Sequence, residues 1–181
     1  MSIKNLYLFV VKMILAIVFT ISMIACNNYD STSRNKRPDD LTESLIKVNK
    51  HMVKIEEEDI NDFIGRYNYK MSSTGTGLRY QIDSVGYGRN VRFGDIVRIR
   101  YKVRLLTGDV IYDSDSTGPK EFVVGKGGVE TGLEEGILLL RNGDRAKFVL
   151  PSHLAFGLLG DNDKVPPKAS IVYDLQVVDL Q

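Results

Sequence analysis

The chain has 181 residues, of which 43% are hydrophobic and 26% charged, so one ordinary folded domain with additional segments is expected, and wholesale disorder or a multi-span membrane protein is excluded. The 24 basic and 23 acidic residues leave a net charge of +1, which argues against a general nucleic-acid-binding protein. One cysteine and two histidines exclude an intrachain disulfide and make a catalytic zinc site of the usual kind unexpected.

Residues 1–25 are predicted to be a lipoprotein signal peptide. They contain two lysines and no acidic residue, and their uncharged stretch, MILAIVFTISMIA, is shorter than the roughly 20 apolar residues of a membrane-spanning helix. The small residue Ala25 precedes Cys26, which resembles the lipidation site of bacterial lipoproteins. We therefore expect a cell-envelope protein anchored by a lipid on Cys26, and, because Asn27 is not an acidic retention signal, anchored in the outer membrane. A chance cysteine after a plain signal peptide or an anchor helix is the alternative.

Residues 26–40 are predicted to be a flexible tether, because they are polar and turn-rich. An apolar stripe with spacings of three and four then predicts an N-terminal helical segment over 41–70. The stripe consists of Leu41, Leu45, Val48, Met52 and Ile55 and, after an acidic run at 56–59, of Ile60, Phe63, Ile64 and Tyr67. One long helix with a register change and two helices with a break both fit. The stripe would pack on the chain's own domain or pair with a second copy in a homodimer.

Residues 75–181 are predicted to form an α+β domain in which an antiparallel sheet of five or six strands wraps a short helix. The clearest alternation, at 97–105, places apolar residues on one strand face and four cations on the other. We interpret the cations as a solvated face with Asp174 and Glu121 among their cross-strand partners. Further strands are expected near 78–82, 110–112, 121–124, 145–150 and 170–180. The short helix would begin with a capping box of Thr131 and Glu134 and would stop at 142–143.

The motifs of several common enzyme chemistries are missing from the sequence. GKGG at 125–128 lacks the spacing of a phosphate-binding Walker loop, and neither GxSxG nor HExxH occurs. His153 stands alone in PSHLAFG, with no second ligand or nucleophile at a useful spacing. We therefore expect no metal and no other cofactor, and only noncovalent chemistry.

The motifs between Phe93 and Leu180 resemble those of FKBP-type peptidyl-prolyl cis/trans isomerases, in the order of that family. They are FGD at 93–95, YDS at 112–114, GLEEG at 132–136, PSHLAFG at 151–157 and VPP at 165–167. The resemblance implies an FKBP-like fold and a shallow aromatic pocket that holds a proline ring.

The resemblance also implies roles for individual residues. Leu133 would lie at the pocket floor, and Asp113, hydrogen-bonded to Tyr101, would lie beside the susceptible carbonyl and act in catalysis with Tyr101 and Tyr112. The backbone N–H of Glu130 would hold a substrate carbonyl. The walls would be Tyr101, Tyr112, Phe122, Val129, Phe156, Val165 and Tyr173. Three positions depart from the family pattern: Leu133 replaces a tryptophan, Phe156 a tyrosine and Lys120 a wall aromatic. The acidic-polar loop LLGDNDK at 158–164 also lacks the usual family residues.

The leading hypothesis is an envelope isomerase that assists the folding of exported or envelope proteins by twisting their X-Pro bonds. An apolar pocket disfavours the charge-separated planar amide, and fixed donors can favour a twisted one, so no proton transfer is needed. A noncatalytic chaperone or proline-binding module on an envelope lipoprotein is the alternative, and a purely structural lipoprotein is a third. The expected partners are proline-containing unfolded or exported polypeptides and, through the lipid, a membrane.

Overall fold

The computed structural model describes residues 38–181, so the predicted signal peptide, Cys26 and most of the predicted tether lie outside the described residues. The chain divides into two units after Val48, and residues 49–181 form the larger one. Within the described residues, no helix combines the length and the hydropathy needed to cross a bilayer.

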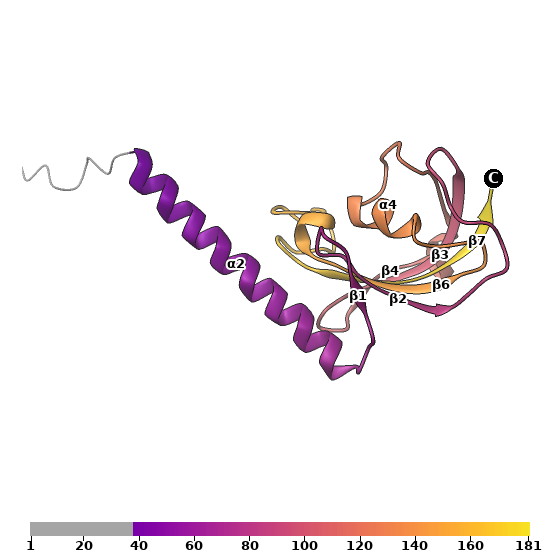
Figure 1. The fold of residues 1–181 in the computed structure, drawn as a ribbon, viewed down its shortest axis with the longest axis horizontal. Helices are drawn as coiled ribbons and strands as arrows, with labels where there is room; N and C mark the ends of the chain where they lie inside the picture. Colours follow the sequence, from indigo (N-terminus) through magenta and orange to yellow (C-terminus); the bar gives the residue numbers. More distant parts are fainter. Residues whose placement is uncertain (1–37) are drawn as a thin grey trace, which may run out of the picture. The chain divides into compact units, whose positions relative to one another are not determined.

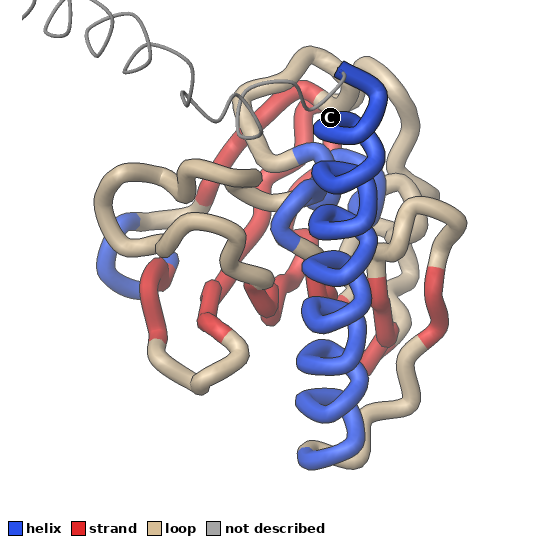
Figure 2. Tube along the Cα trace, turned by 90° about the vertical axis from the view of Figure 1, so that its left-hand side faces the viewer, coloured by secondary structure: helices blue, strands red, loops and turns tan. Residues whose placement is uncertain are grey.

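Helix α2, Pro38–Arg66, is continuous through the acidic run at 56–59, so of the two alternatives the structure has the single long helix (Figure 2). It begins within the predicted tether because Pro38, Asp39 and Asp40 already form its first turn. The acidic run changes only which side chains face inward: Ile55 is exposed, whereas Ile60 and Phe63 are buried. The predicted homodimer through this helix stays a prediction.

Seven antiparallel strands form one sheet in the order β1-β2-β6-β7-β3-β4, with β5 also paired to β3 (Figure 1). The strands are β1 (Ser72–Ser73), β2 (Arg79–Ser84), β3 (Ile96–Leu105), β4 (Val110–Asp113), β5 (Lys120–Val123), β6 (Arg145–Leu150) and β7 (Ile171–Leu180). The α+β fold is therefore confirmed, with one strand more than the predicted five or six. The additional strand is β1, whose two serines carry no alternation that could have predicted it.

The inner face of the curved sheet holds the main hydrophobic core and the short helix α4, Thr131–Ile137 (Figure 1). Leu133 and Ile137 of α4 are completely buried, as is Phe148 of β6. The predicted capping box does not form: the Thr131 hydroxyl donates to the carbonyl oxygen of Leu154 at 3.4 Å. The Glu134 carboxylate instead accepts the N–H of Gly127 at 2.8 Å. The helix ends at Ile137, before the predicted stop.

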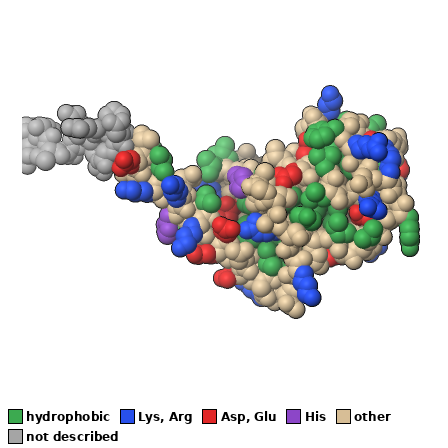
Figure 3. Space-filling view, viewed as in Figure 1, with side chains coloured by type: hydrophobic (Ala, Val, Ile, Leu, Met, Phe, Trp, Pro, Cys, Tyr) green, Lys and Arg blue, Asp and Glu red, His purple; other side chains and the backbone are tan. Residues whose placement is uncertain are grey.

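The cations of β3 lie on the opposite, charged face, as predicted, and most have acidic partners. Arg104 pairs with Asp174, the predicted partner, while Arg98 pairs at 3.1 Å with Asp179 and not with Glu121. Charged and apolar side chains are interspersed over the surface of the domain that is visible in Figure 3.

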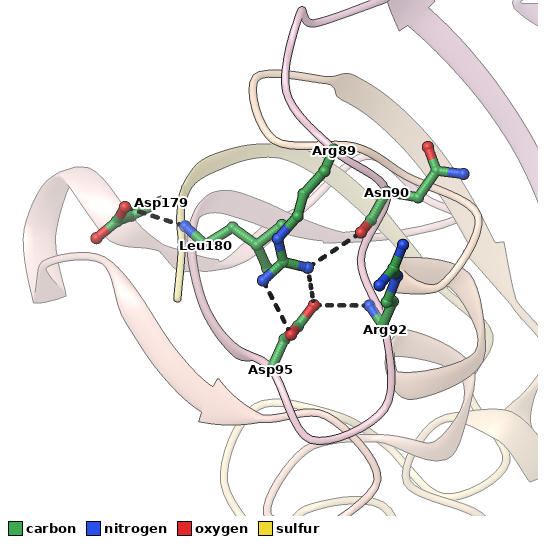
Figure 4. Close-up of polar contacts among 6 residues, drawn as sticks. All are labelled: Arg89, Asn90, Arg92, Asp95, Asp179 and Leu180. Carbon is green, nitrogen blue, oxygen red and sulfur yellow. Dashed lines mark hydrogen bonds and ion pairs between the residues drawn. The ribbon is translucent and has the colours of Figure 1, made fainter.

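The turn before β3 depends on Asp95, the acidic residue of the FGD motif (Figure 4). Its carboxylate accepts the backbone N–H of Arg92 at 2.8 Å and pairs with the guanidinium of Arg89 at 2.6 Å. The hydrogen bond from Arg89 is the main reason that the pKa of Asp95 lies below its usual value. The carboxylate therefore stabilises the folded chain in its ionised form.

Acidification is expected to remove this contribution. Because the folded-state pKa of Asp95 is depressed, its stabilisation is fully present above the unfolded pKa of about 3.9 and declines as the pH falls through the folded-state value. Urea-unfolding midpoints of the native chain and of Asp95→Asn should therefore differ at pH 6 and converge towards pH 2.5. A constant difference over this range would contradict the assignment.

Candidate functional site

A cavity of about 510 Å³ lies beside the N-terminal end of α4, within the range of small-ligand sites. Four aromatic side chains line it, and charged side chains enter it from β5, the segment before α4 and the loop before β7. The lining residues are Tyr101, Tyr112, Lys120, Gly128, Val129, Glu130, Ala155, Phe156, Asp161 and Tyr173.

The strand register explains why three tyrosines meet in this cavity. Val103 of β3 lies opposite Tyr112 of β4 on one side and opposite Tyr173 of β7 on the other. Tyr101 lies two residues before Val103 and therefore on the same face. The rings of Tyr101 and Tyr173 have centroids 6.1 Å apart, and their planes are inclined to each other by 44°. The pairing of β3 with β4 and β7, together with the alternation along β3, thus places the three tyrosines on one face of three adjacent strands.

Two of the three tyrosine hydroxyls donate to carboxylates of the cavity. The Tyr173 hydroxyl donates to Glu130 at 2.9 Å, and burial, followed by the charge of Glu130, raises the pKa of Tyr173 well above its usual value. The Tyr112 hydroxyl donates to Asp161, and this hydrogen bond is the main reason that the pKa of Tyr112 rises to about 12. The Tyr101 hydroxyl donates to no atom of residues 38–181.

Three of the predicted pocket residues lie beside the cavity and not on its surface. Leu133 is completely buried in α4, Phe122 is 8% exposed on β5 and Val165 is 3% exposed before β7. All three belong to the hydrophobic core that supports the walls. Six predicted residues are brought together as lining: Tyr101, Tyr112, Val129, Glu130, Phe156 and Tyr173.

Asp113 does not lie in the cavity, and its predicted hydrogen bond to Tyr101 is absent. Asp113 lies opposite Lys102 in the β3–β4 pair, on the charged face, and the two side chains pair at 3.0 Å. Its other oxygen accepts the N–H of Asp115 at 2.9 Å and caps helix α3, Ser114–Thr117. This backbone hydrogen bond, followed by the one from Lys102, lowers the pKa of Asp113. The alternation that points Tyr112 inward points its neighbour outward.

Two charged lining residues, Lys120 and Asp161, were not predicted as site residues from the sequence. Lys120 was noted only as a departure from the family pattern. Asp161 lies in the loop before β7, where no periodicity assigns a direction to a side chain. Its Oδ1 accepts three successive backbone N–H groups, from residues 163, 164 and 165. An aspartate followed by polar turn residues is the one local signal for such a turn. Residues 38–181 hold no cluster of three or more acidic, histidine or cysteine side chains that could bind a metal ion.

The comparisons with known proteins place the cavity within the part of the chain that resembles one family. The family model described as FKBP-type peptidyl-prolyl cis-trans isomerase matches residues 88–178. A protein of Neisseria meningitidis named "Probable FKBP-type peptidyl-prolyl cis-trans isomerase FkpA" is 36% identical over 111 residues, which are 61% of this chain and 40% of that protein. A probable isomerase of the same type from Haemophilus influenzae is 32% identical over 61% of this chain and 45% of its own length. The chain thus matches less than half the length of these curated relatives.

Two solved structures resemble the fold. The crystal structure of AtFKBP13 superimposes with a TM-score of 0.59 and 27% identity, and covers 62% of this chain and 99% of its own. The crystal structure of FkpA from Escherichia coli superimposes with a TM-score of 0.61 over 98% of this chain and 95% of its own, at 21% identity, which supports the fold alone.

Proposed function

The chain belongs to the FKBP-type peptidyl-prolyl cis-trans isomerase family, and on this premise we propose that it catalyses the cis/trans isomerisation of X-Pro peptide bonds in polypeptides. The observation that supports the proposal most is the aromatic cavity, in which Tyr101, Tyr112 and Tyr173 meet Phe156 within the region that matches the family. Aromatic and aliphatic walls offer a proline ring an apolar site that needs no cofactor.

The proposed mechanism acts on the double-bond character of the peptide bond, which creates a rotational barrier of about 18–20 kcal/mol. A planar amide separates more charge than a twisted one, so a partly desolvated apolar cavity favours the twisted geometry. Rotation also requires the segments on either side of the bond to be held while the bond turns. Hydrogen-bond donors on the cavity surface would supply this hold.

The Tyr101 hydroxyl and the Glu130 backbone N–H are donors in the cavity that are available for a substrate. Tyr112 and Tyr173 already direct their protons to carboxylates, whereas the Tyr101 hydroxyl and the Glu130 N–H donate to no atom within residues 38–181. We assign these two groups to carbonyl oxygens of the bound polypeptide. Tyr101 would thereby supply a hydroxyl donor in a cavity where Phe156 replaces a tyrosine of the family pattern.

Removing the Tyr101 hydroxyl tests this assignment. We expect the native chain to accelerate isomerisation of X-Pro test peptides, and Tyr101→Phe to lower kcat/KM about two- to tenfold, because one hydrogen bond contributes about 0.5–1.5 kcal/mol. Tyr87→Phe, at a fully exposed tyrosine outside the cavity, is the matched control and should keep native activity. A native chain that gives no acceleration would overturn the proposed function.

A noncatalytic polypeptide-binding function is the second candidate, and a second groove favours it. This groove, of about 730 Å³, lies between residues 49–59 in the middle of α2 and the loops around η2, Ser152–Leu154. Apolar side chains dominate its lining, among them Met52, Val53 and Leu158. An inactive chain that still suppresses aggregation of an unfolded test protein would support this second function.

We further propose that the protein acts in the cell envelope, attached to the outer membrane by a lipid on Cys26. The support is the sequence alone: an uncharged run after two lysines, ending at Ala25 before the cysteine. Intact mass of the membrane-extracted protein should show an acylated N-terminal cysteine, and Cys26→Ser should lose the lipid. An unmodified cysteine in the native protein would overturn the proposed anchor.

A further inference from the structure

Two carboxylates lie close to Tyr112, and only one of them enters the cavity. Asp113 is the next residue in the chain, yet it faces the charged side of the sheet and pairs with Lys102. Asp161 comes from a distant loop, lines the cavity and accepts the Tyr112 hydroxyl. Asp161 therefore supplies the carboxylate that is bonded to Tyr112 in the cavity, as Glu130 supplies the one bonded to Tyr173.

The two oxygens of Asp161 bind two different elements. Oδ1 accepts the backbone N–H groups of Asp163 at 3.0 Å, Lys164 at 2.9 Å and Val165 at 2.7 Å. Oδ2 accepts the Tyr112 hydroxyl. One side chain thus closes the turn before β7 and joins that turn to the end of β4. The hydroxyl of Tyr112 cannot move away from the loop without losing this partner.

The charge state of Asp161 suits this role. Partial burial by itself would raise the pKa of Asp161, but the hydrogen bonds from Tyr112 and from the three backbone N–H groups outweigh it and lower that pKa to about 2. The carboxylate is then ionised throughout the neutral range and can only accept hydrogen bonds. The ammonium of Lys164 lies 5.2 Å from the centre of the Tyr112 ring and adds a second contact between loop and wall.

The direction of the Tyr112 hydroxyl proton limits what this residue can offer a ligand. Because it points at Asp161, Tyr112 presents to a ligand its ring and oxygen lone pairs but no donor. Tyr101 is then left as the one tyrosine in the cavity whose hydroxyl proton has no partner among the described residues. With its hydroxyl held in this direction, Tyr112 offers a ligand only an aromatic surface, whereas Tyr101 can donate a hydrogen bond to it.

We infer that Asp161 is a positioning residue of the proline site, which fixes Tyr112 as an aromatic wall and locks the 161–165 turn against it. The inference rests on the proposed isomerase function, and it gives Asp161 a role that the family resemblance did not assign. It acts through Tyr112 and not through direct contact with the reacting bond.

A double-mutant cycle on the full chain tests the inference. Asp161→Ala and Tyr112→Phe should each lower kcat/KM for an X-Pro peptide about tenfold. The double variant should lose little more than Asp161→Ala, because Asp161→Ala already removes the contact that Tyr112→Phe removes. Asp161→Asn keeps the size and one acceptor oxygen, and should restore part of the activity. Asp62→Ala, at an exposed position of α2 outside the cavity, is the matched control and should stay within twofold of the native chain.

The activities are compared per folded molecule, with the folded fraction taken from urea unfolding of each variant. A role in stability alone would shift the unfolding midpoint but leave the activity of the folded fraction native, and would overturn the inference. Additive losses in the double variant would also overturn it. A native chain without activity overturns the proposed function and the inference together, whereas an active native chain with unaffected Asp161 variants overturns the inference alone.

Discussion

Replacement of Phe63 by alanine is expected to lower the free energy of unfolding by about 3–5 kcal/mol, the typical cost of removing a buried phenylalanine side chain. Phe63 is 3% exposed and, with Ile60, packs on Val149 and Val172, both completely buried. These two valines lie on the outer face of β6 and β7, opposite the face that covers α4. Without the ring, the last turns of α2 would leave a cavity over this face.

The aromatic residues that follow the helix add to the expected effect. The Phe63 ring has its centroid 4.8 Å from that of Tyr67 and 6.0 Å from that of Tyr69. Tyr69 also lies under the ammonium of Lys147, 5.1 Å from the ring centre. Lys147 is largely buried, and burial is the main reason that its pKa lies below the usual value. Loss of Phe63 therefore loosens a cluster that also shields a buried cation.

Chemical unfolding followed by circular dichroism measures this effect. Asp62→Ala, at the adjacent exposed position of the same helix, is the matched control and should change the unfolding free energy by less than about 0.5 kcal/mol. A loss below about 1 kcal/mol for Phe63→Ala would show that the helix is not packed on the sheet in solution.

The packing of α2 illustrates what the sequence could predict and what it left open. Its stripe predicted the helix, but packing on the domain and pairing with a second copy both fitted that stripe. The discriminating signal lies in the partner strands. Phe148-Val149-Leu150 and Ile171-Val172-Tyr173 are continuous apolar runs, typical of strands that are covered on both faces. The long strand β3 alternates instead, and one of its faces is charged.

In the cavity, the residues on strands could be predicted, whereas the residue from a loop could not. The family resemblance identified Tyr101, Tyr112 and Tyr173, and the strand register brings them together. The register also explains why Asp113 was misplaced, since adjacent strand residues face opposite sides of a sheet. Asp161 could not be found in this way, because a loop has no periodicity and its contact with Tyr112 spans 49 residues of sequence.

A pair of helical glycines is expected to respond to the same substitution with opposite signs. A Cβ atom built on Gly136 of α4 would lie 2.5 Å from Cε2 of Phe148, in the packed core, where the rigid ring and its sheet neighbours leave little room to move. Overpacking of this kind costs about 1–3 kcal/mol, so Gly136→Ala should lower the free energy of unfolding. A Cβ atom on Gly65 of α2 meets no atom within 4 Å.

Gly65→Ala should therefore stabilise the chain by about 0.5–1 kcal/mol, because alanine loses less backbone entropy than glycine when a helix forms. Chemical unfolding of both variants beside the native chain gives the comparison directly. Because Gly136 packs closely against Phe148, the free energy of unfolding should fall in Gly136→Ala and rise in Gly65→Ala. Gly136→Ala should also disturb Leu133, a neighbour in α4 that supports the cavity. Stabilisation by both substitutions would mean that α4 stands away from the sheet, and that the cavity beside it has a different floor.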